Sequence, residues 1–106
     1  LTSWSFSDNE TRSSIHNTKD SFNYIIDPHT AVGLLGLKTY HRENGTDCTG
    51  IFLATAHPGK FAEVIEPIIS EKVSIPKRLQ ESMSKEKHAI MLPNQYSYLK
   101  EYLLET

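Results

Sequence analysis

The stretch Gly-Ile-Phe-Leu-Ala-Thr at residues 50–55 is a short, continuously apolar run in a chain of 106 residues. Turn-forming residues bound it on both sides, at 43–47 before it and at 56–59 after it. An unbroken apolar run of this length is typical of a strand buried on both faces, as in a parallel sheet. The sequence therefore predicts one buried strand over about 50–55 within an α/β fold that otherwise consists mostly of helices.

A strong helix start precedes this predicted strand at Asp27 and Pro28. Asp27 can accept hydrogen bonds from the free N–H groups of a first helical turn, and Pro28 suits the first helical position because its missing N–H is not needed there. The helix is expected to run to about Arg42. Its first half is apolar nearly all round, and Gly33 and Gly36 predict close approach of another backbone.

Further elements follow from caps, prolines and periodicity. A helix is expected to begin near Lys60, with apolar residues at helical spacing, and Pro67 predicts that it kinks or ends. Residues 24–26 predict a short strand or an extended link. The remaining expected helices run from the capping box of Ser7 and Glu10 to about Lys19, from Pro76 through Met83, and from Pro93 onward.

A single convincing buried strand is awkward for an independent domain. A lone strand cannot satisfy its backbone N–H and C=O groups inside a core. The chain therefore resembles part of a larger α/β body whose neighbouring strands lie elsewhere. We expect residues 1–106 to form a single segment of such a body, with residues 1–22 as a polar helical lead-in.

Composition excludes several classes of protein. The 11 Lys and Arg against 13 Asp and Glu give a net charge of −2, which favours neither a nucleic-acid partner nor a membrane partner. Cys48 is the only cysteine, so an internal disulfide is excluded, and no His or Cys spacing indicates a metal site. No signal peptide pattern is visible, and we expect a cytoplasmic protein.

Two places could carry chemistry. Thr55, at the carboxyl end of the predicted strand, precedes the turn that contains His57, and open α/β sheets bind ligands at that end of their strands. The helix start at Asp27 could face an anion or a cofactor ring. From spacing alone, a plain strand-to-helix turn and a well-capped structural helix are the simpler interpretations of these two places.

Four segments together resemble the C-terminal region of the threonine synthase family, whose members are fold-type II enzymes dependent on pyridoxal 5'-phosphate. The resemblance is firm from about Tyr24 to Leu104. The Thr-Ala-His-Pro-x-Lys-Phe block is its most specific element. The segments are Asp-Pro-His-Thr-Ala-Val-Gly (27–33), Leu-Ala-Thr-Ala-His-Pro-Gly-Lys-Phe (53–61), Ile-Pro-Lys-Arg-Leu (75–79) and Leu-Pro-Asn-Gln-Tyr (92–96).

The resemblance implies a reaction in which O-phospho-L-homoserine and water give L-threonine and phosphate. It implies that Thr55 hydrogen-bonds the pyridine nitrogen of the cofactor, and that Asp27 lies where relatives have an acidic residue near the ring. His57 and Lys60 either contact the substrate or hold the turn. In the family, the lysine that forms the Schiff base and the loop that holds the cofactor phosphate lie far upstream. This chain is therefore expected to contain no catalytic residue, to be inactive alone, and to need the remaining N-terminal part of the enzyme as its partner.

Two alternatives remain open at this point. A threonine-synthase-like phospho-lyase, acting on another phosphorylated amino compound, would share the same C-terminal blocks. A non-catalytic remnant or interaction module that packs against a larger partner would also fit the lone strand.

Overall fold

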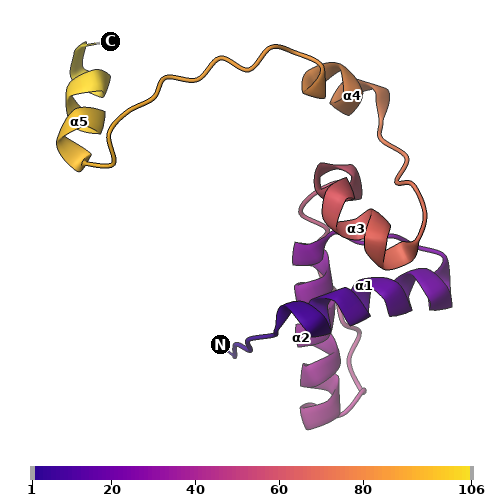
Figure 1. The fold of residues 1–106 in the computed structure, drawn as a ribbon. Helices are drawn as coiled ribbons and strands as arrows, with labels where there is room; N and C mark the ends of the chain where they lie inside the picture. Colours follow the sequence, from indigo (N-terminus) through magenta and orange to yellow (C-terminus); the bar gives the residue numbers. More distant parts are fainter. Residues whose placement is uncertain (1, 106) are drawn as a thin grey trace. The chain divides into compact units, whose positions relative to one another are not determined.

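The computed structural model describes residues 2–105, and all of its regular elements in that range are helical. The chain divides into two compact units, Leu1–Pro76 and Lys77–Thr106, and each is described by itself. Figure 1 shows the helices of both units. The first unit contains α1 (Asp8–Phe22), α2 (Pro28–Asn44), the 3₁₀ helix η1 (Pro58–Phe61) and α3 (Ala62–Ile69). The second unit contains α4 (Lys77–Met83) and α5 (Tyr96–Glu105).

Helix α1 begins at the predicted capping box. The Ser7 hydroxyl accepts a hydrogen bond from the Glu10 N–H at 3.4 Å, and the Glu10 carboxylate accepts one from the Ser7 N–H at 2.7 Å. These reciprocal bonds satisfy N–H groups that have no partner inside the helix. The hydrogen bonds from Ser7 also lower the pKa of Glu10. The prediction of this helix start is confirmed, and the helix continues beyond Lys19 to Phe22.

Helix α2 starts as predicted, with Asp27 as its cap and Pro28 at its first position. It ends at Asn44, where Gly45 takes a φ of 86°, a backbone conformation that favours glycine. The expectation that another backbone lies against Gly33 and Gly36 is not met. The atoms nearest to a Cβ built on these glycines belong to side chains, Phe52 Cβ at 3.9 Å and Trp4 Cε3 at 3.8 Å.

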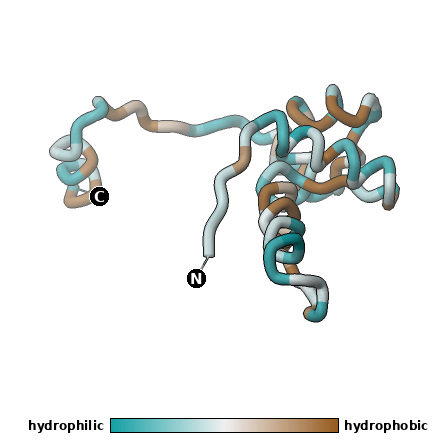
Figure 2. The backbone as a smooth tube through the Cα atoms, turned by 90° about the horizontal axis from the view of Figure 1, so that it is seen from below, coloured by the Kyte–Doolittle hydropathy of each residue, from teal (hydrophilic) through white to brown (hydrophobic). Residues whose placement is uncertain are grey.

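A small core holds the first unit together where α1 lies against both α2 and α3 (Figure 1). Ile15 of α1, Ala31 of α2 and Ile65 of α3 have no exposed surface. Ile26 and Val73 complete the buried set. Figure 2 shows that hydrophobic stretches on these helices alternate with hydrophilic ones, as expected for helices that bury one face.

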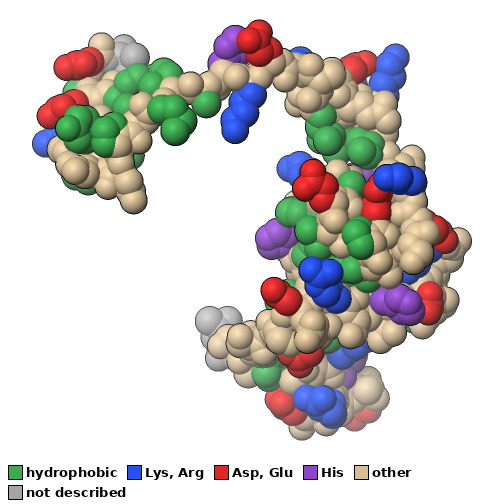
Figure 3. Space-filling model, viewed as in Figure 1, with side chains coloured by type: hydrophobic (Ala, Val, Ile, Leu, Met, Phe, Trp, Pro, Cys, Tyr) green, Lys and Arg blue, Asp and Glu red, His purple; other side chains and the backbone are tan. Residues whose placement is uncertain are grey.

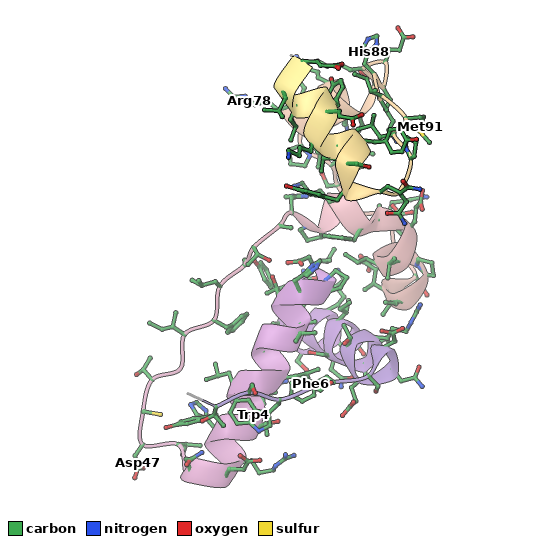
Figure 4. All side chains as sticks on the ribbon, turned by 90° about the vertical axis from the view of Figure 1, so that its left-hand side faces the viewer. Trp4, Phe6, Asp47, Arg78, His88 and Met91 are labelled. Carbon is green, nitrogen blue, oxygen red and sulfur yellow. The ribbon has the colours of Figure 1, made fainter. Side chains whose placement is uncertain are left out.

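The predicted strand over 50–55 is wrong for this structure. These residues run back alongside α2 without forming a ladder (Figures 1 and 4), and the Ile51 and Leu53 side chains are 83% and 77% exposed. Residues 24–26 likewise form no strand, although Ile26 is buried. A strand needs a neighbouring strand to pair its backbone groups, and residues 2–105 contain none.

The helix predicted to begin near Lys60 is present, but helical structure starts earlier, at Pro58, first as η1 and then as α3. The periodicity of its apolar residues is reflected in burial: Ile65 is fully buried, and Phe61, Ile68 and Ile69 pack against the core. Pro67 lies inside α3, which ends two residues later. The Glu66 carboxylate accepts hydrogen bonds from Lys72 Nζ at 2.6 Å and from the Val73 N–H at 3.1 Å. These bonds hold the turn beyond the helix end.

The second unit contains α4 and α5. Helix α4 follows Pro76 and ends at Met83, as predicted. Helix α5 begins three residues after Pro93. Apolar residues along this helix are exposed: Tyr96, Leu99 and Leu103 are 78%, 46% and 64% exposed. The hydrophobic side chains on this helix are visible at the surface in Figure 3.

Within residues 2–105, the helices are too short or too polar to cross a membrane.

Candidate functional site

Asp27 lies at the centre of a hydrogen-bonded cluster at the start of α2. Its side chain is 1% exposed. Oδ1 accepts hydrogen bonds from the His29 N–H at 2.9 Å and the Thr30 N–H at 3.4 Å, and it lies 3.2 Å from His29 Nδ1. Oδ2 accepts a hydrogen bond from the Thr30 hydroxyl. The capping role expected of Asp27 is therefore confirmed, and both carboxylate oxygens are engaged within the chain.

Two opposing effects act on the pKa of Asp27. Burial raises the pKa, because it disfavours the charged form of the carboxyl. Hydrogen bonds from the Thr30 hydroxyl, the two backbone N–H groups and the His29 ring favour the charged form, and together they outweigh burial. The net effect is a pKa below the usual value, so Asp27 is an anion at neutral pH.

His29 connects this cluster to the turn that follows Thr55. Its ring lies 5.2 Å from that of Phe61, centroid to centroid, at an interplanar angle of 52°. Phe61 ends η1 and packs against the core. A hollow of about 290 Å³ lies on the same part of the first unit, and Pro28, Phe61 and Ile15 help to line it. The start of α2 and residues 58–61 are thus neighbours in space.

His57 caps η1. Its Nδ1 accepts a hydrogen bond from the Gly59 N–H at 3.0 Å. Gly59 is buried, and a Cβ built on it would meet His57 Nδ1 at 3.1 Å and Ile75 Cγ1 at 3.2 Å. This close packing explains why a glycine occupies the turn. Of the two roles considered for His57, holding the turn is the one seen within this chain.

Thr55 lies just before this turn, in an extended segment without regular structure. Thr55 is exposed, and its hydroxyl has no hydrogen-bond partner within residues 2–105. The structure brings the turn of His57 close to the cluster of Asp27 through the contact of His29 with Phe61. Asp27 and His57 each form hydrogen bonds within their own turns, and neither bonds to the hydroxyl of Thr55.

Two members of the cluster, His29 and Thr30, were not predicted from the sequence. A signal was available for Thr30, because residues three positions apart on a helical turn are neighbours and a hydroxyl can donate a hydrogen bond to a carboxylate. His29 gave no such signal, since its contact with Phe61 joins residues 32 positions apart. Among the side chains that the structure describes, no three His, Cys, Asp or Glu residues are grouped as a metal site.

Comparisons with known proteins place these observations in a family. Residues 30–103 match the family model for the C-terminal region of threonine synthase. Threonine synthase of Haemophilus influenzae is 32% identical over all 106 residues, and threonine synthase of Schizosaccharomyces pombe is 43% identical over 65 residues, or 60% of the chain. The matched region makes up 24% of the first of these proteins and 13% of the second.

Two solved structures show the same likeness in three dimensions. The crystal structure of threonine synthase from Escherichia coli superposes on 92% of this chain with a TM-score of 0.75 and 29% identity, over 22% of its own length. A pyridoxal-phosphate-bound threonine synthase from Brucella melitensis gives a TM-score of 0.64 and 27% identity, over 92% of this chain and 20% of its own.

These matches define a class first: the chain is built like the C-terminal region of a much longer enzyme. It belongs to the threonine synthase C-terminal family. The chain spans about a quarter or less of the length of the curated relatives it matches.

Proposed function

We propose that this chain is the C-terminal part of a threonine synthase, which converts O-phospho-L-homoserine and water to L-threonine and phosphate. The observation that carries the proposal is the family match over residues 30–103, which includes the segment 53–61. The alignment with the Haemophilus influenzae enzyme supports the proposal further, because it covers all 106 residues of this chain and so includes the cluster of Asp27. The relatives bear the name of this enzyme, which favours it over a related phospho-lyase.

One feature of the described residues is compatible with a pyridoxal phosphate cofactor. Thr55 offers an exposed hydroxyl without a partner among the described residues, and a neutral hydroxyl can hydrogen-bond a pyridine nitrogen. When bound, the cofactor supplies an electron sink for carbanions. We propose that Thr55 contacts its ring nitrogen. The contacts of Asp27 and His57 within the chain favour a supporting role, in which they hold the two helix starts next to the cofactor.

We propose the remaining N-terminal part of the enzyme as the partner of this chain. The exposed apolar side chains of Ile51 and Leu53, and those along α5, are too numerous for an ordinary free surface. The relatives are about four or more times longer than the matched region, so they contain enough additional protein to cover these side chains. By the family resemblance that part also holds the lysine that bonds the cofactor, and we expect this chain alone to be inactive.

A hybrid enzyme tests the proposal. Residues 1–106 replace the matching region of the Haemophilus influenzae threonine synthase, with which they align over their whole length. We expect the hybrid to bind pyridoxal phosphate, to show the absorbance of the bound cofactor, and to release phosphate from O-phospho-L-homoserine. The Thr55→Val variant, which removes the hydroxyl at nearly constant volume, should shift that absorbance, and Thr55→Ser should restore it.

The matched control is Thr49→Val, an exposed threonine ahead of the same extended segment. It should leave absorbance and turnover unchanged. A hybrid that is folded by circular dichroism but binds no cofactor would refute the proposal and favour a non-catalytic interaction module. Equal effects of Thr49→Val and Thr55→Val would show that Thr55 has no special relation to the cofactor.

A further inference from the structure

His29 is in contact with two parts of the first unit at once. Its Nδ1 lies 3.2 Å from the buried Oδ1 of Asp27, and its ring lies 5.2 Å from that of Phe61. Its own side chain is 64% exposed, whereas that of Asp27 is 1% exposed. A side chain with so much exposed surface contributes little to the core, so these two contacts define what it does.

The chemistry of the pair fixes the orientation of the ring. Asp27 is an anion and can only accept hydrogen bonds, so the nitrogen that faces it must carry the proton. Nδ1–H then donates to Oδ1, and the carboxylate holds the imidazole in one tautomer and one orientation, as second partners do for functional histidines. With the ring held in this way, one of its sides remains in contact with Phe61.

The segment that contains Thr55 lies against α2 at Gly33, where the Phe52 Cβ is 3.9 Å from a Cβ built on that glycine. Residues 50–55 form no ladder, and Thr55 itself is without a hydrogen-bond partner in the described part of the chain. The chain is held again after Thr55, where His57 caps η1, Gly59 packs on Ile75, and Phe61 packs on the core and meets His29. The contact between Phe61 and His29 joins this turn directly to the capped start of α2.

We propose that His29 is a positioning residue, which transmits the fixed geometry of Asp27 to residues 55–61 and so places the hydroxyl of Thr55. This inference rests on the proposed function in one respect, the role of Thr55 at the cofactor. Its structural half, the hold of His29 on the turn, is independent of any enzymatic activity. The two halves therefore have separate tests.

The structural half is tested by NMR on the 106-residue chain. His29→Asn keeps a donor near the place of Nδ1 and removes the ring, His29→Phe keeps a ring and removes the donor, and His29→Ala removes both. The control is His16→Ala, since His16 forms a His–Asp pair with Asp20 at 3.4 Å within α1 that is exposed on both sides. Backbone order parameters report the mobility of residues 55–61, and the nitrogen shifts of His29 report its tautomer.

We expect the Nδ1–H tautomer in the unmodified chain. In His29→Ala, order parameters over 56–61 should fall from roughly 0.85 toward about 0.6, the range of flexible backbone. His29→Asn and His29→Phe should each restore part of the loss, and His16→Ala should change nothing there. Unchanged order parameters in His29→Ala, or a loosening spread evenly over α1, α2 and α3, would overturn the inference.

The functional half is tested in the hybrid enzyme, through the absorbance of bound pyridoxal phosphate. His29→Ala should shift that absorbance in the same direction as Thr55→Val, and His29→Phe should shift it less. If Thr55→Val shifts the absorbance and His29→Ala does not, the positioning role is wrong and the proposed function stands. If neither shifts it while residues 55–61 still loosen, the role of Thr55 is wrong and His29 only stabilises the turn.

Discussion

The buried carboxylate of Asp27 accepts a hydrogen bond from the hydroxyl of Thr30, three residues further along the chain. This contact closes the first turn of α2 by a side-chain bond in addition to the backbone N–H groups that Asp27 caps. The charged Asp27, the N–H groups that it caps and the hydroxyl that it binds thus all lie within four residues. Much of what can be tested in this structure depends on that turn.

Replacement of Asp27 by alanine should destabilise the first unit. The change removes an N-cap and leaves the N–H groups of His29 and Thr30 without their acceptor, and N-cap replacements of this kind cost about 0.5–2 kcal/mol. The result should lie at the upper end, because the site is buried. The measurement is the free energy of unfolding from urea titration. Asp20→Ala, at an exposed site late in α1, is the control and should have a much smaller effect.

The free energy of unfolding should decrease at acid pH because of Asp27. Its pKa in the folded chain is below 3.8, the value for the free group, so its contribution is fully present above that value. The contribution is lost as pH falls through the lower folded pKa, where the native carboxylate becomes protonated. Unfolding free energies at about pH 6 and about pH 3 measure this loss. Asp27→Asn should show a smaller difference between the two conditions, and an unchanged difference would contradict the assignment.

Replacement of two isoleucines by alanine should change the free energy of unfolding by very different amounts. Ile65 is fully buried, so Ile65→Ala should cost about 2–5 kcal/mol through lost burial and a residual cavity. Ile51 is 83% exposed, so Ile51→Ala should leave the unfolding free energy of this chain nearly unchanged. The same Ile51→Ala change in the hybrid enzyme should reduce stability, because we expect the rest of the enzyme to cover that side chain. Equal, small effects of Ile51→Ala in the 106-residue chain and in the hybrid enzyme would count against our expectation that the rest of the enzyme covers Ile51.

Two glycines should respond in opposite directions to alanine. At Gly59 a new Cβ would press on His57 Nδ1 and Ile75 Cγ1, so Gly59→Ala should destabilise the chain by about 1–3 kcal/mol. At Gly33 the nearest atom is 3.9 Å away and the residue lies inside α2, so Gly33→Ala should stabilise it by about 0.5–1 kcal/mol. Thermal unfolding followed by circular dichroism separates the two. A loss of stability at both positions would mean that α2 is packed more tightly than the structure shows.

The helix starts of this protein follow from local features of its sequence. The bonds of Ser7 with Glu10, and the cap of Asp27 before Pro28, join residues at most three positions apart, so their chemistry can be recognised without knowledge of the fold. The same holds for the turn at His57, where the caps and the proline are neighbours in sequence. The family resemblance rested on four local segments, two of which contain the cap of Asp27 and the turn at His57, and the comparisons confirmed it.

The conformation of the apolar run at residues 50–55 depended instead on the tertiary fold. A strand is defined by hydrogen bonds to another strand, and the sequence of the run cannot show whether that partner is present. Within the described chain it is absent, and Ile51 and Leu53 are exposed. The contact between His29 and Phe61 was equally a product of the fold, because side chains 32 positions apart meet only when α2 and η1 pack together.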